Sequence, residues 1–572
     1  MIFKSKKIWL VLILLLAAGL RLWGLNQYPA GLNADEAAIG YNVYSLILTG
    51  KDEHGNSWPL HFKSFGDYKP GLYFYLVLPL VKLLGLNVWA VRLPSAILGI
   101  ASVWLIFLLV KELFDDETLS LIAAFFLAIS PWHLHFSRGG WEVNFATFLI
   151  LLGTWLFFKG LKQAKFFPWS VLAYILSFYT YHSARIVVPL LGLGLVILYR
   201  NKIFKRTNRQ AIVASGILAA IIFFPLVYGF LGPAGISRFA GVGWLADIGP
   251  LWRVNELRGH HGATMALSVR LLHNRFLAYS IAFVQNWFDH FQGVFLFITG
   301  DVIERSRVPE SGQMHLFEIP FLLLGIYFLI SQRPKNWPVV FLWLGVAPVA
   351  AAMTFQTPHA LRAHNMVIPL TIINAYGFCH LWLWIKKKGV KLLVLGYLLL
   401  VIIAILWGTS YYLHQYYVHY PKVYPFAWEY GFDELVEYVK KEKDEYEKVY
   451  VTDRYDQPYI LFLFYLQYPP EKFQEEVKLT PRDRFGFATV RDFDKFHFAS
   501  IKFEELKKEA NVLIIGTDEE IPIITVSDKT RQLIKEGKAP EPPRIIKEIY
   551  FKDGSIAFQV VKTAKWPKSP SL

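Results

Sequence analysis

Long apolar runs separated by short basic segments dominate this chain of 572 residues. A helix needs about 20 apolar residues to cross the hydrocarbon core of a bilayer. Charged residues make up 18% of the chain, which is low for a soluble protein. The sequence therefore predicts a polytopic α-helical membrane protein. We expect eleven spans, at 8–25, 91–112, 118–136, 143–160, 168–184, 186–200, 210–231, 318–332, 337–355, 365–385 and 391–411.

Charge and cysteine content narrow the class of protein further. The net charge of +15 is compatible with nucleic-acid binding, but membrane proteins gather lysine and arginine in cytoplasmic loops and against anionic lipids. We therefore expect contacts with membrane lipids and no nucleic-acid partner. Cys379 is the single cysteine, which excludes an intrachain disulfide and a cysteine-based metal site. The basic N-terminus lacks a small-residue cleavage site, which predicts a retained first span.

Two more apolar runs, 69–86 and 276–299, are predicted to stay outside the bilayer core. If neither run spans, the basic loops all fall on one side: KSKK, FKGLKQAKFF, YRNKIFKRTNRQ, SQRPKN and IKKKGVK. The positive-inside rule assigns that side to the cytoplasm. We expect 69–86 to lie along the outer interface, and 276–299 to lie at the membrane surface or pack in an external loop. The predicted location is the plasma (inner) membrane, with a cytoplasmic N-terminus.

The predicted topology leaves three large pieces on the extracytoplasmic face. Residues 1–411 form the transmembrane domain, which includes the external loops 26–90 and 232–317, and residues 412–572 form a small α/β domain. In that domain, FDELVEYVKKEKDEYEKVYVTD predicts a helix and then a strand, and NVLIIGTD predicts a buried strand. RIIKEIYFKDGSIAFQVVK predicts a hairpin that turns at Asp553 and Gly554. YILFLFYLQY is too short to span and is expected to pack in the domain or on the membrane.

Polar side chains gather at the outer ends of the predicted spans, where a water-accessible cavity would open. The topology was derived from loop charge without using these polar residues, and it places all of them on one face. The candidate site residues are Asp35, Glu36, Asp67, Lys69, Arg138, Glu142, Asn144, Tyr181, His182, Arg185, Arg305, His359 and Arg362.

Each candidate also has a structural interpretation. Asn33 to Glu36 fits an N-x-x-E variant of the capping box, with acids favoured in the first helical turn. Cationic side chains at span ends commonly extend toward lipid head groups. Histidines such as His133, His135 and His359 more often donate or accept hydrogen bonds than bind metal, and their spacing specifies no metal site. The sequence names no cofactor and leaves a divalent cation open.

Taken together, one or two carboxylates among several cations suit an anionic lipid head group. Glycosyl transfer from a lipid-linked phosphosugar needs charge neutralisation at the leaving phosphate and one general base for the acceptor. It does not need the two carboxylates of soluble glycosidases. Two alternatives stay open: a transporter or flippase for an anionic lipid-linked saccharide, and a ligase that moves a whole glycan. Span interiors nearly free of acids disfavour the transporter.

The order of the motifs resembles a known family. ADEA follows the first span, then come GDYKPGLYFYL, VRLPSAILG and SPWHLHFSRGGWEVN, and later LFITGD and PHALR. This order is similar to that of the polytopic GT-C glycosyltransferases, in particular the bacterial branch that resembles protein O-mannosyltransferases and lipid A aminoarabinose transferases. The resemblance covers about residues 1–385 and is strongest over 28–145.

The resemblance implies a polyprenyl-phosphate sugar as donor and inverting transfer on the extracytoplasmic side to a protein, lipid or glycan acceptor. It implies that Asp35 is the base and that Glu36 shares its environment or caps the helix. It also implies that Lys69 contacts the donor phosphate.

For Glu142, preceded by Arg138, the resemblance implies a second acidic site. The chain departs from the family in carrying KPG in place of KPP, and Trp-Glu where many relatives carry Arg and Asp. Arg138 is also a phosphate-binding candidate, and Arg185 and Arg362 are added as such from the cationic cluster alone.

Overall fold

The computed structural model describes residues 6–230, 247–262, 266–483, 487–523, 532 and 542–563. By their contacts, the residues form two compact units. The helical unit comprises Met1–Leu25, Tyr68–Tyr73 and Arg92–Tyr417, and the sheet unit comprises Asn26–Asp67, Phe74–Val91 and Val418–Leu572. Most of the first external loop therefore makes its contacts with the C-terminal part of the chain, although chain order groups it with the spans.

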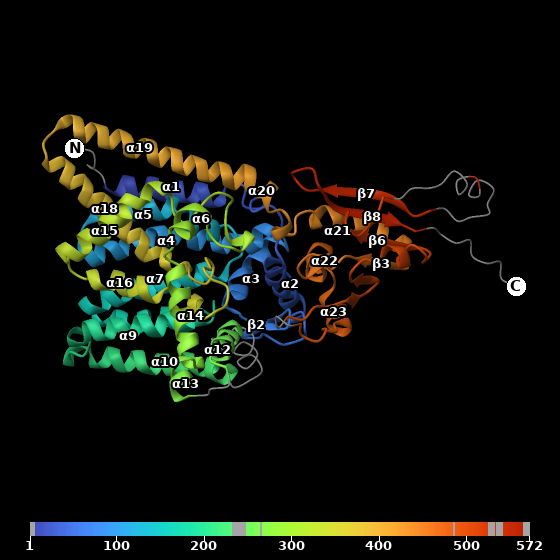
Figure 1. Cartoon of the computed structure of the whole chain (residues 1–572), viewed down its shortest axis with the longest axis horizontal. Coiled ribbons are helices and arrows are strands. Elements are labelled where there is room, and N and C mark those ends of the chain that lie inside the picture. The colour runs from blue at the N-terminus through green and yellow to red at the C-terminus, as the bar shows by residue number, and fades with distance from the viewer. Residues whose placement is uncertain are drawn as a thin grey trace. The chain divides into compact units, whose positions relative to one another are not determined.

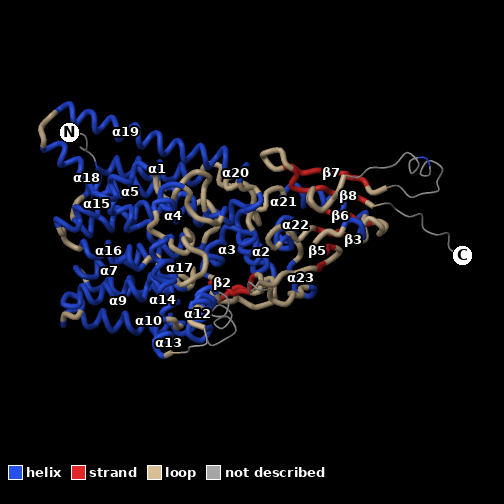
Figure 2. Tube along the Cα trace, in the orientation of Figure 1, coloured by secondary structure: helices blue, strands red, loops and turns tan. Residues whose placement is uncertain are grey.

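A helix lies at each of the eleven predicted spans (Figures 1 and 2). Six described helices are long and apolar enough to cross a bilayer, and α5 and α6, bent by 59°, make a seventh if they form one span. The remaining four spans are shorter helices. The elements are α1 (Lys6–Leu22), α4 (Val88–Phe114), α5 (Glu117–Ile129), α6 (Pro131–Ser137), α7 (Glu142–Lys162), α8 (Phe167–Phe178), α9 (Ala184–Ile203), α10 (Arg209–Phe230), α15 (Ile319–Gln332), α16 (Trp337–Val346), α17 (Val349–Ala352), α18 (Val367–Lys387) and α19 (Lys391–His414).

Prolines mark the starts of two short helices and divide a third predicted span. α8 and α15 each begin with a proline in the first turn and follow a short 3-10 turn. Pro348 separates α16 from α17. Proline lacks the amide hydrogen that a continuing helix needs and is favoured at a helix start. Apolar runs that look continuous by hydropathy are thus divided by residues that hydropathy does not register.

The two runs predicted to stay outside the bilayer core form helices below spanning length, α3 (Leu72–Leu84) and α14 (Arg275–Asp289). α14 packs against the region of α16 and α17. The Trp287 indole donates to the Gly345 carbonyl at 2.9 Å, and the Asn286 amide donates to the Ala352 carbonyl at 3.2 Å. The same loop contains α12 (Gly249–Gly259) and α13 (Leu267–Leu272).

Glycines bring α15 and α18 close together within the helical unit. A Cβ atom on Gly377 would lie 2.6 Å from the Gly325 nitrogen and closer still to the Phe321 carbonyl oxygen. Small residues permit this kind of backbone approach between membrane helices. α19 is mostly exposed, since only 6% of its most apolar stretch is buried. It lies at the edge of the bundle beside α18 (Figure 1).

The sheet unit contains a six-stranded mixed sheet in its described residues, with strand order β4-β5-β3-β6-β8-β7. β3 is parallel to both β5 and β6, and the other pairs are antiparallel. The strands are β3 (Lys448–Val451), β4 (Asp492–Phe493), β5 (Phe496–Phe498), β6 (Val512–Gly516), β7 (Arg544–Tyr550) and β8 (Ile556–Lys562), and β1 (His61–Ser64) and β2 (Asp67–Pro70) precede them in the chain. The unit's helices are α2 (Ala34–Thr49), α20 (Tyr420–Val423), α21 (Phe432–Glu442), α22 (Pro458–Leu466), α23 (Pro470–Glu476) and α24 (Phe503–Leu506).

The predicted elements of the C-terminal domain are confirmed. α21 precedes β3, every residue of β6 is buried, and β7 and β8 form the hairpin, with Gly554 at φ 91° in its turn. The apolar segment that is too short to span forms α22, which packs inside the unit.

α2 is integrated into this unit. The Tyr41 hydroxyl donates to the Tyr468 carbonyl at 3.0 Å, and the Gln474 amide donates to the Ser45 hydroxyl at 3.0 Å. The space beside Gly40 is filled by the Phe464 ring. α2 therefore has a fixed position on α22 and α23.

Candidate active site

The two adjacent acids at the start of α2 have different surroundings. Asn33 caps the helix, because its side-chain oxygen accepts the Glu36 amide hydrogen at 3.0 Å. The Asn33 amide in turn lies 3.4 Å from the Glu36 carboxylate, and both side chains are fully buried. Asp35 is only half-buried. The predicted helix cap is confirmed for Asn33 and Glu36, and Asp35 is the acid that stays accessible.

The loop before α2 is held in place by backbone packing. Gly31 has φ 96°, and a Cβ atom there would overlap the Trp428 carbonyl. The Trp428 indole donates to the Tyr420 hydroxyl at 2.6 Å, and both side chains are buried. A residue with a side chain is disfavoured at this φ and has no room here. This close approach fixes the start of the helix that carries Asp35.

A buried acidic turn follows α2, and the sequence analysis did not single it out. Asp52 accepts the amide hydrogens of His54 and Asn56 at 2.9 and 2.8 Å. Glu53 accepts from the Asn42 amide at 3.2 Å, and both acids are fully buried. Burial raises the pKa of Asp52 and lowers the pKa of His54 to about 4. The adjacent acids in KDEHGNSWP were the only sign of this turn in the sequence, and whether they are buried depends on the fold.

In the helical unit, Lys69, Tyr181, His182 and Arg185 are brought together. His182 Nε2 lies 3.2 Å from the Tyr68 carbonyl, and the Leu72 amide donates to the Tyr179 carbonyl at 2.8 Å. Arg185 donates to His182 Nδ1 at 2.9 Å, so Nε2 carries the hydrogen that is donated to Tyr68. All four candidate side chains are half-buried. We call Lys69, Tyr181, His182 and Arg185 the lysine cluster.

A second cluster surrounds Asp301, which is fully buried. The Asp301 carboxylate accepts the amide hydrogens of Ala360 at 2.6 Å and Ile303 at 2.9 Å. The His359 amide donates to His290 Nε2 at 3.1 Å, and His290 Nδ1 lies 2.8 Å from the Asn286 carbonyl. His290 is therefore neutral with its hydrogen on Nδ1. Burial lowers the pKa of His290 to about 4, in agreement with this tautomer.

Three predicted site residues belong to this Asp301 cluster. His359 Nδ1 lies 3.5 Å from the Asp301 carboxylate. Burial lowers the pKa of His359, with Asp301 acting to raise it and Arg362 and Arg305 acting to lower it. Arg362 donates to the Thr354 hydroxyl at 2.7 Å. His359 therefore lies beside one buried acid, and Arg362 and Arg305 lie near enough to His359 to lower its pKa. Asp301 appeared in the sequence only as the last residue of the LFITGD motif.

The remaining candidates of the helical unit hold helices together. Arg138 is fully buried, donates to the Leu20 and Trp23 carbonyls at 2.7 Å, and lies over the Tyr416 and Tyr417 rings. It thus satisfies carbonyls at the end of α1.

Asn144 is also fully buried and joins α7 to α4 through the Ser95 carbonyl at 2.8 Å. Glu142 is half-buried and is the first residue of α7.

The candidates thus fall into separate groups. The lysine cluster and the Asp301 cluster lie in the helical unit, and Asp35, Glu36 and the half-buried Asp67 lie in the sheet unit. Among the residues that the structure describes, no group of three or more His, Cys, Asp and Glu is arranged to hold a metal ion.

Comparison with solved structures identifies the fold. The chain is similar to ArnT from Cupriavidus metallidurans in the apo state, with a TM-score of 0.53 and 10% identity over 96% of this chain and 97% of ArnT. The structure of the same protein bound to undecaprenyl phosphate gives a TM-score of 0.51 and 11% identity over 99% and 100% of the two chains. The oligosaccharyltransferase of Archaeoglobus fulgidus in its apo form gives a TM-score of 0.51 and 13% identity over 91% of this chain and 70% of the other. The protein therefore has the GT-C fold of polytopic membrane glycosyltransferases.

Sequence comparisons give matches over part of the chain. Residues 68–228 match the family described as dolichyl-phosphate-mannose-protein mannosyltransferase. The putative mannosyltransferase YkcB of Bacillus subtilis (strain 168) is 26% identical over 163 residues, which is 28% of this chain and 22% of YkcB. YycA of the same organism is 28% identical over 170 residues, or 29% and 23% of the two chains. The matches span less than a quarter of either relative, and they confirm the resemblance to the mannosyltransferase branch of the GT-C proteins.

Proposed function

We propose that the protein is a membrane glycosyltransferase that moves a sugar from a polyprenyl-phosphate-linked donor to an acceptor hydroxyl. Transfer takes place with inversion on the extracytoplasmic face. The observation that carries the proposal is the difference between the two acids of α2, since Glu36 is buried in the helix cap and Asp35 is half-buried on the same rigid helix. A fixed, accessible carboxylate is suited to act as a general base.

In the proposed reaction, the Asp35 carboxylate takes the proton of the acceptor hydroxyl while the hydroxyl oxygen attacks the anomeric carbon. The bond from that carbon to the phosphate oxygen breaks, and polyprenyl phosphate leaves with the bonding electrons. One displacement inverts the anomeric centre. Lys69 and Arg185 neutralise the charge that develops on the phosphate. Arg362 and Arg305 supply a second cationic group, while Arg138, Asn144 and Glu36 position helices.

The comparisons support this assignment of the donor. The matched segment 68–228 begins beside Lys69 and contains Arg185. A protein of the same fold, ArnT, was crystallised with undecaprenyl phosphate, which is the lipid class that we propose here.

The test of the base is Asp35→Asn in purified full-length protein supplied with a panel of polyprenyl-phosphate sugars. Mass spectrometry follows consumption of the donor. Removal of a general base lowers turnover by about 10²–10⁴-fold. The control is Asp553→Asn. Asp553 is an exposed acid of the same unit, and the amide oxygen of asparagine can still accept the Ser555 amide hydrogen in the turn. Near-normal turnover in Asp35→Asn would show that another group is the base.

The test of the phosphate site is Lys69→Ala with Lys82→Ala as the matched control, since Lys82 is exposed at the end of α3. A hydrogen bond to a charged group contributes about 1.5–3 kcal/mol. We therefore expect donor affinity to fall by roughly 10–100-fold in Lys69→Ala and to stay unchanged in the control. Equal donor affinity in the two variants would remove Lys69 from the phosphate site.

A further inference from the structure

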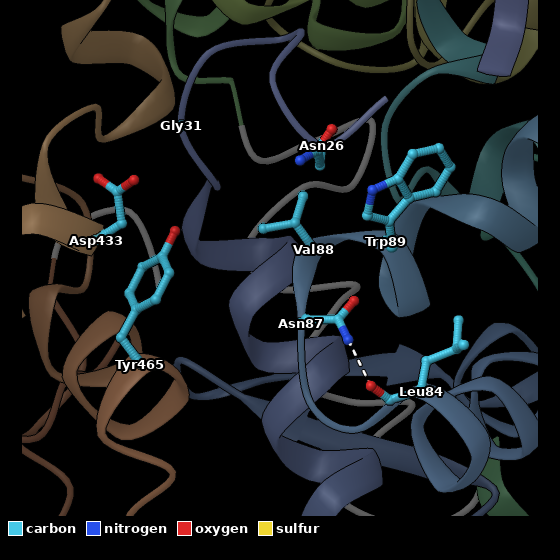
Figure 3. A pocket seen from close by; sticks show the side chains of 8 residues that line it. All are labelled: Asn26, Gly31, Leu84, Asn87, Val88, Trp89, Asp433 and Tyr465. Carbon is cyan, nitrogen blue, oxygen red and sulfur yellow. Dashed lines mark hydrogen bonds between the residues drawn. The ribbon is translucent and has the colours of Figure 1, made fainter. Parts of the chain in front are cut away.

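The sheet unit contains an open pocket of about 670 Å³ next to the loop that leads into α2. Figure 3 shows Asp433 and Tyr465 on one wall and Val88 and Trp89 on the opposite wall, with Asn26 at one end. The walls come from the starts of α21 and α4 and from the end of α22. A volume of about 300–1,000 Å³ is typical of sites for small organic ligands.

The floor of the pocket is rigid. The Asn87 amide donates to the Leu84 carbonyl at 2.8 Å, and its oxygen accepts the Ala90 amide hydrogen at 3.0 Å. Asn87 therefore caps α4 and fixes the direction of Trp89 two residues later. On the far side, Gly31 is held against the Trp428 carbonyl, as described above. The pocket thus has a preformed shape.

The side chains that face the pocket combine aromatic rings with hydrogen-bonding groups. The half-buried rings of Trp89 and Tyr465 offer apolar faces, the Asp433 carboxylate accepts hydrogen bonds, and the Asn26 amide both donates and accepts. A sugar ring has the matching surfaces, with C–H groups on its faces and hydroxyl groups on its edges. A carboxylate disfavours a phosphate, because like charges repel.

An aromatic rim extends from the same loop. The Lys552 ammonium lies 5.2 Å from the Tyr28 ring centre and 5.6 Å from that of Tyr430. These contacts are cation–π interactions, and both rings share one lysine. Tyr28 is two residues from Asn26, and Tyr430 is three residues from Asp433. The chain segments that line the pocket therefore carry two further aromatic side chains.

We propose that this pocket binds a saccharide, and that it holds the glycan of the acceptor. The second statement rests on the proposed function. Gly31 in the pocket wall and Asp35 are four residues apart in one unit, so their Cα atoms are no more than about 14 Å apart. An acceptor glycan that extends from the pocket toward α2 reaches the proposed base.

The test uses full-length protein in detergent without donor and a panel of neutral di- to tetrasaccharides of mannose, glucose and N-acetylglucosamine. Saturation-transfer NMR detects binding, and calorimetry measures the affinity. The variants are Trp89→Ala, which removes a stacking face, and Asp433→Asn, which keeps the shape and removes the charge. The matched control is Glu434→Gln, since Glu434 is the next residue of α21, is exposed and pairs with Lys547 at 2.6 Å.

We expect at least one saccharide to bind, with affinity lowered tenfold or more in Trp89→Ala and Asp433→Asn and unchanged in Glu434→Gln. Absence of binding by the unmodified protein would overturn the proposal. So would binding that both pocket variants retain, or binding that inorganic phosphate displaces. Saccharide binding without any sugar transfer would refute the proposed function and leave the pocket assignment standing. Sugar transfer to acceptors that carry no saccharide, by a protein that binds no saccharide, would refute the pocket assignment and leave the proposed function standing.

Discussion

The close approach of α15 and α18 makes a strong prediction for Gly377→Ala. The new Cβ atom would lie 2.6 Å from the Gly325 nitrogen and nearer to the Phe321 carbonyl oxygen. Non-bonded heavy atoms settle at about 3.5–4.0 Å, so relief of the Gly325 contact alone needs a shift of roughly 1 Å, and relief of the nearer Phe321 contact needs more. Both neighbouring atoms belong to the backbone, and no change of rotamer relieves the overlap.

The size of the effect follows from two opposing contributions. Overpacking costs about 1–3 kcal/mol, and backbone overlap puts this case at the upper end. Alanine is favoured over glycine inside a helix by about 1 kcal/mol. The expected net destabilisation is therefore about 2 kcal/mol. Gly396→Ala in α19 is the matched control, because a Cβ atom there meets nothing within 4 Å and only the favourable contribution remains.

Thermal unfolding in detergent, followed by tryptophan fluorescence, measures the difference between the two variants. We expect the Tm of Gly377→Ala to fall by a few °C and that of Gly396→Ala to stay level or rise. A Gly377→Ala protein as stable as Gly396→Ala would refute the argument that contact of the two backbones holds α15 and α18 together.

Three further predictions concern the Asp301 cluster and the topology. The folded-state pKa of His290, about 4, lies below the ordinary value of 6.5. The stabilising contribution of the neutral imidazole is therefore present above pH 6.5 and is lost as the pH falls toward 4. The Tm of the protein should fall over that pH range, and the Tm of His290→Asn should fall less. Asp301→Ala leaves the buried Ala360 amide and the half-buried Ile303 amide without their acceptor, at about 1–3 kcal/mol for the buried one, and should lower the Tm clearly. A Tm like that of the parent would mean that the loop does not depend on this acid. A reporter fused after residue 86 should report the outer face and one fused after residue 163 the cytoplasm, and a cytoplasmic signal at the first position would contradict the predicted topology.

The helical plan was predictable because hydropathy and loop charge act over long stretches of chain. The helices at the eleven predicted spans, the two apolar helices below spanning length and the order of helix and strands near the C-terminus follow from such patterns. Where single residues decide the outcome, the patterns are less informative. Pro348 divides the predicted span 337–355 into α16 and α17, and α14 packs through Asn286 and Trp287 against carbonyls that no periodicity reveals.

The site was predictable in residue type more than in role. Counting cations at the span ends found Arg138 and Arg185 alike, but only the structure distinguishes them. Arg138 is fully buried against the carbonyls at the end of α1, and Arg185 is half-buried beside His182. Asp52 and Glu53 were missed because an adjacent acid pair in a loop usually stays in water. Burial of such a pair depends on long-range packing, which one sequence does not display.

The packing of α2 has a consequence for how such proteins diversify. The helix that carries Asp35 makes contacts with α22 and α23, from the other end of the chain, and Gly40 leaves room for the Phe464 ring. A C-terminal domain from a homologue would therefore meet a surface that was shaped for a different partner. Recombination at residue 418 alone should give chimaeras that misfold around α2. Chimaeras that exchange residues 26–67 and 74–91 together with the C-terminal domain should retain the interface, because these separate stretches form one packing unit.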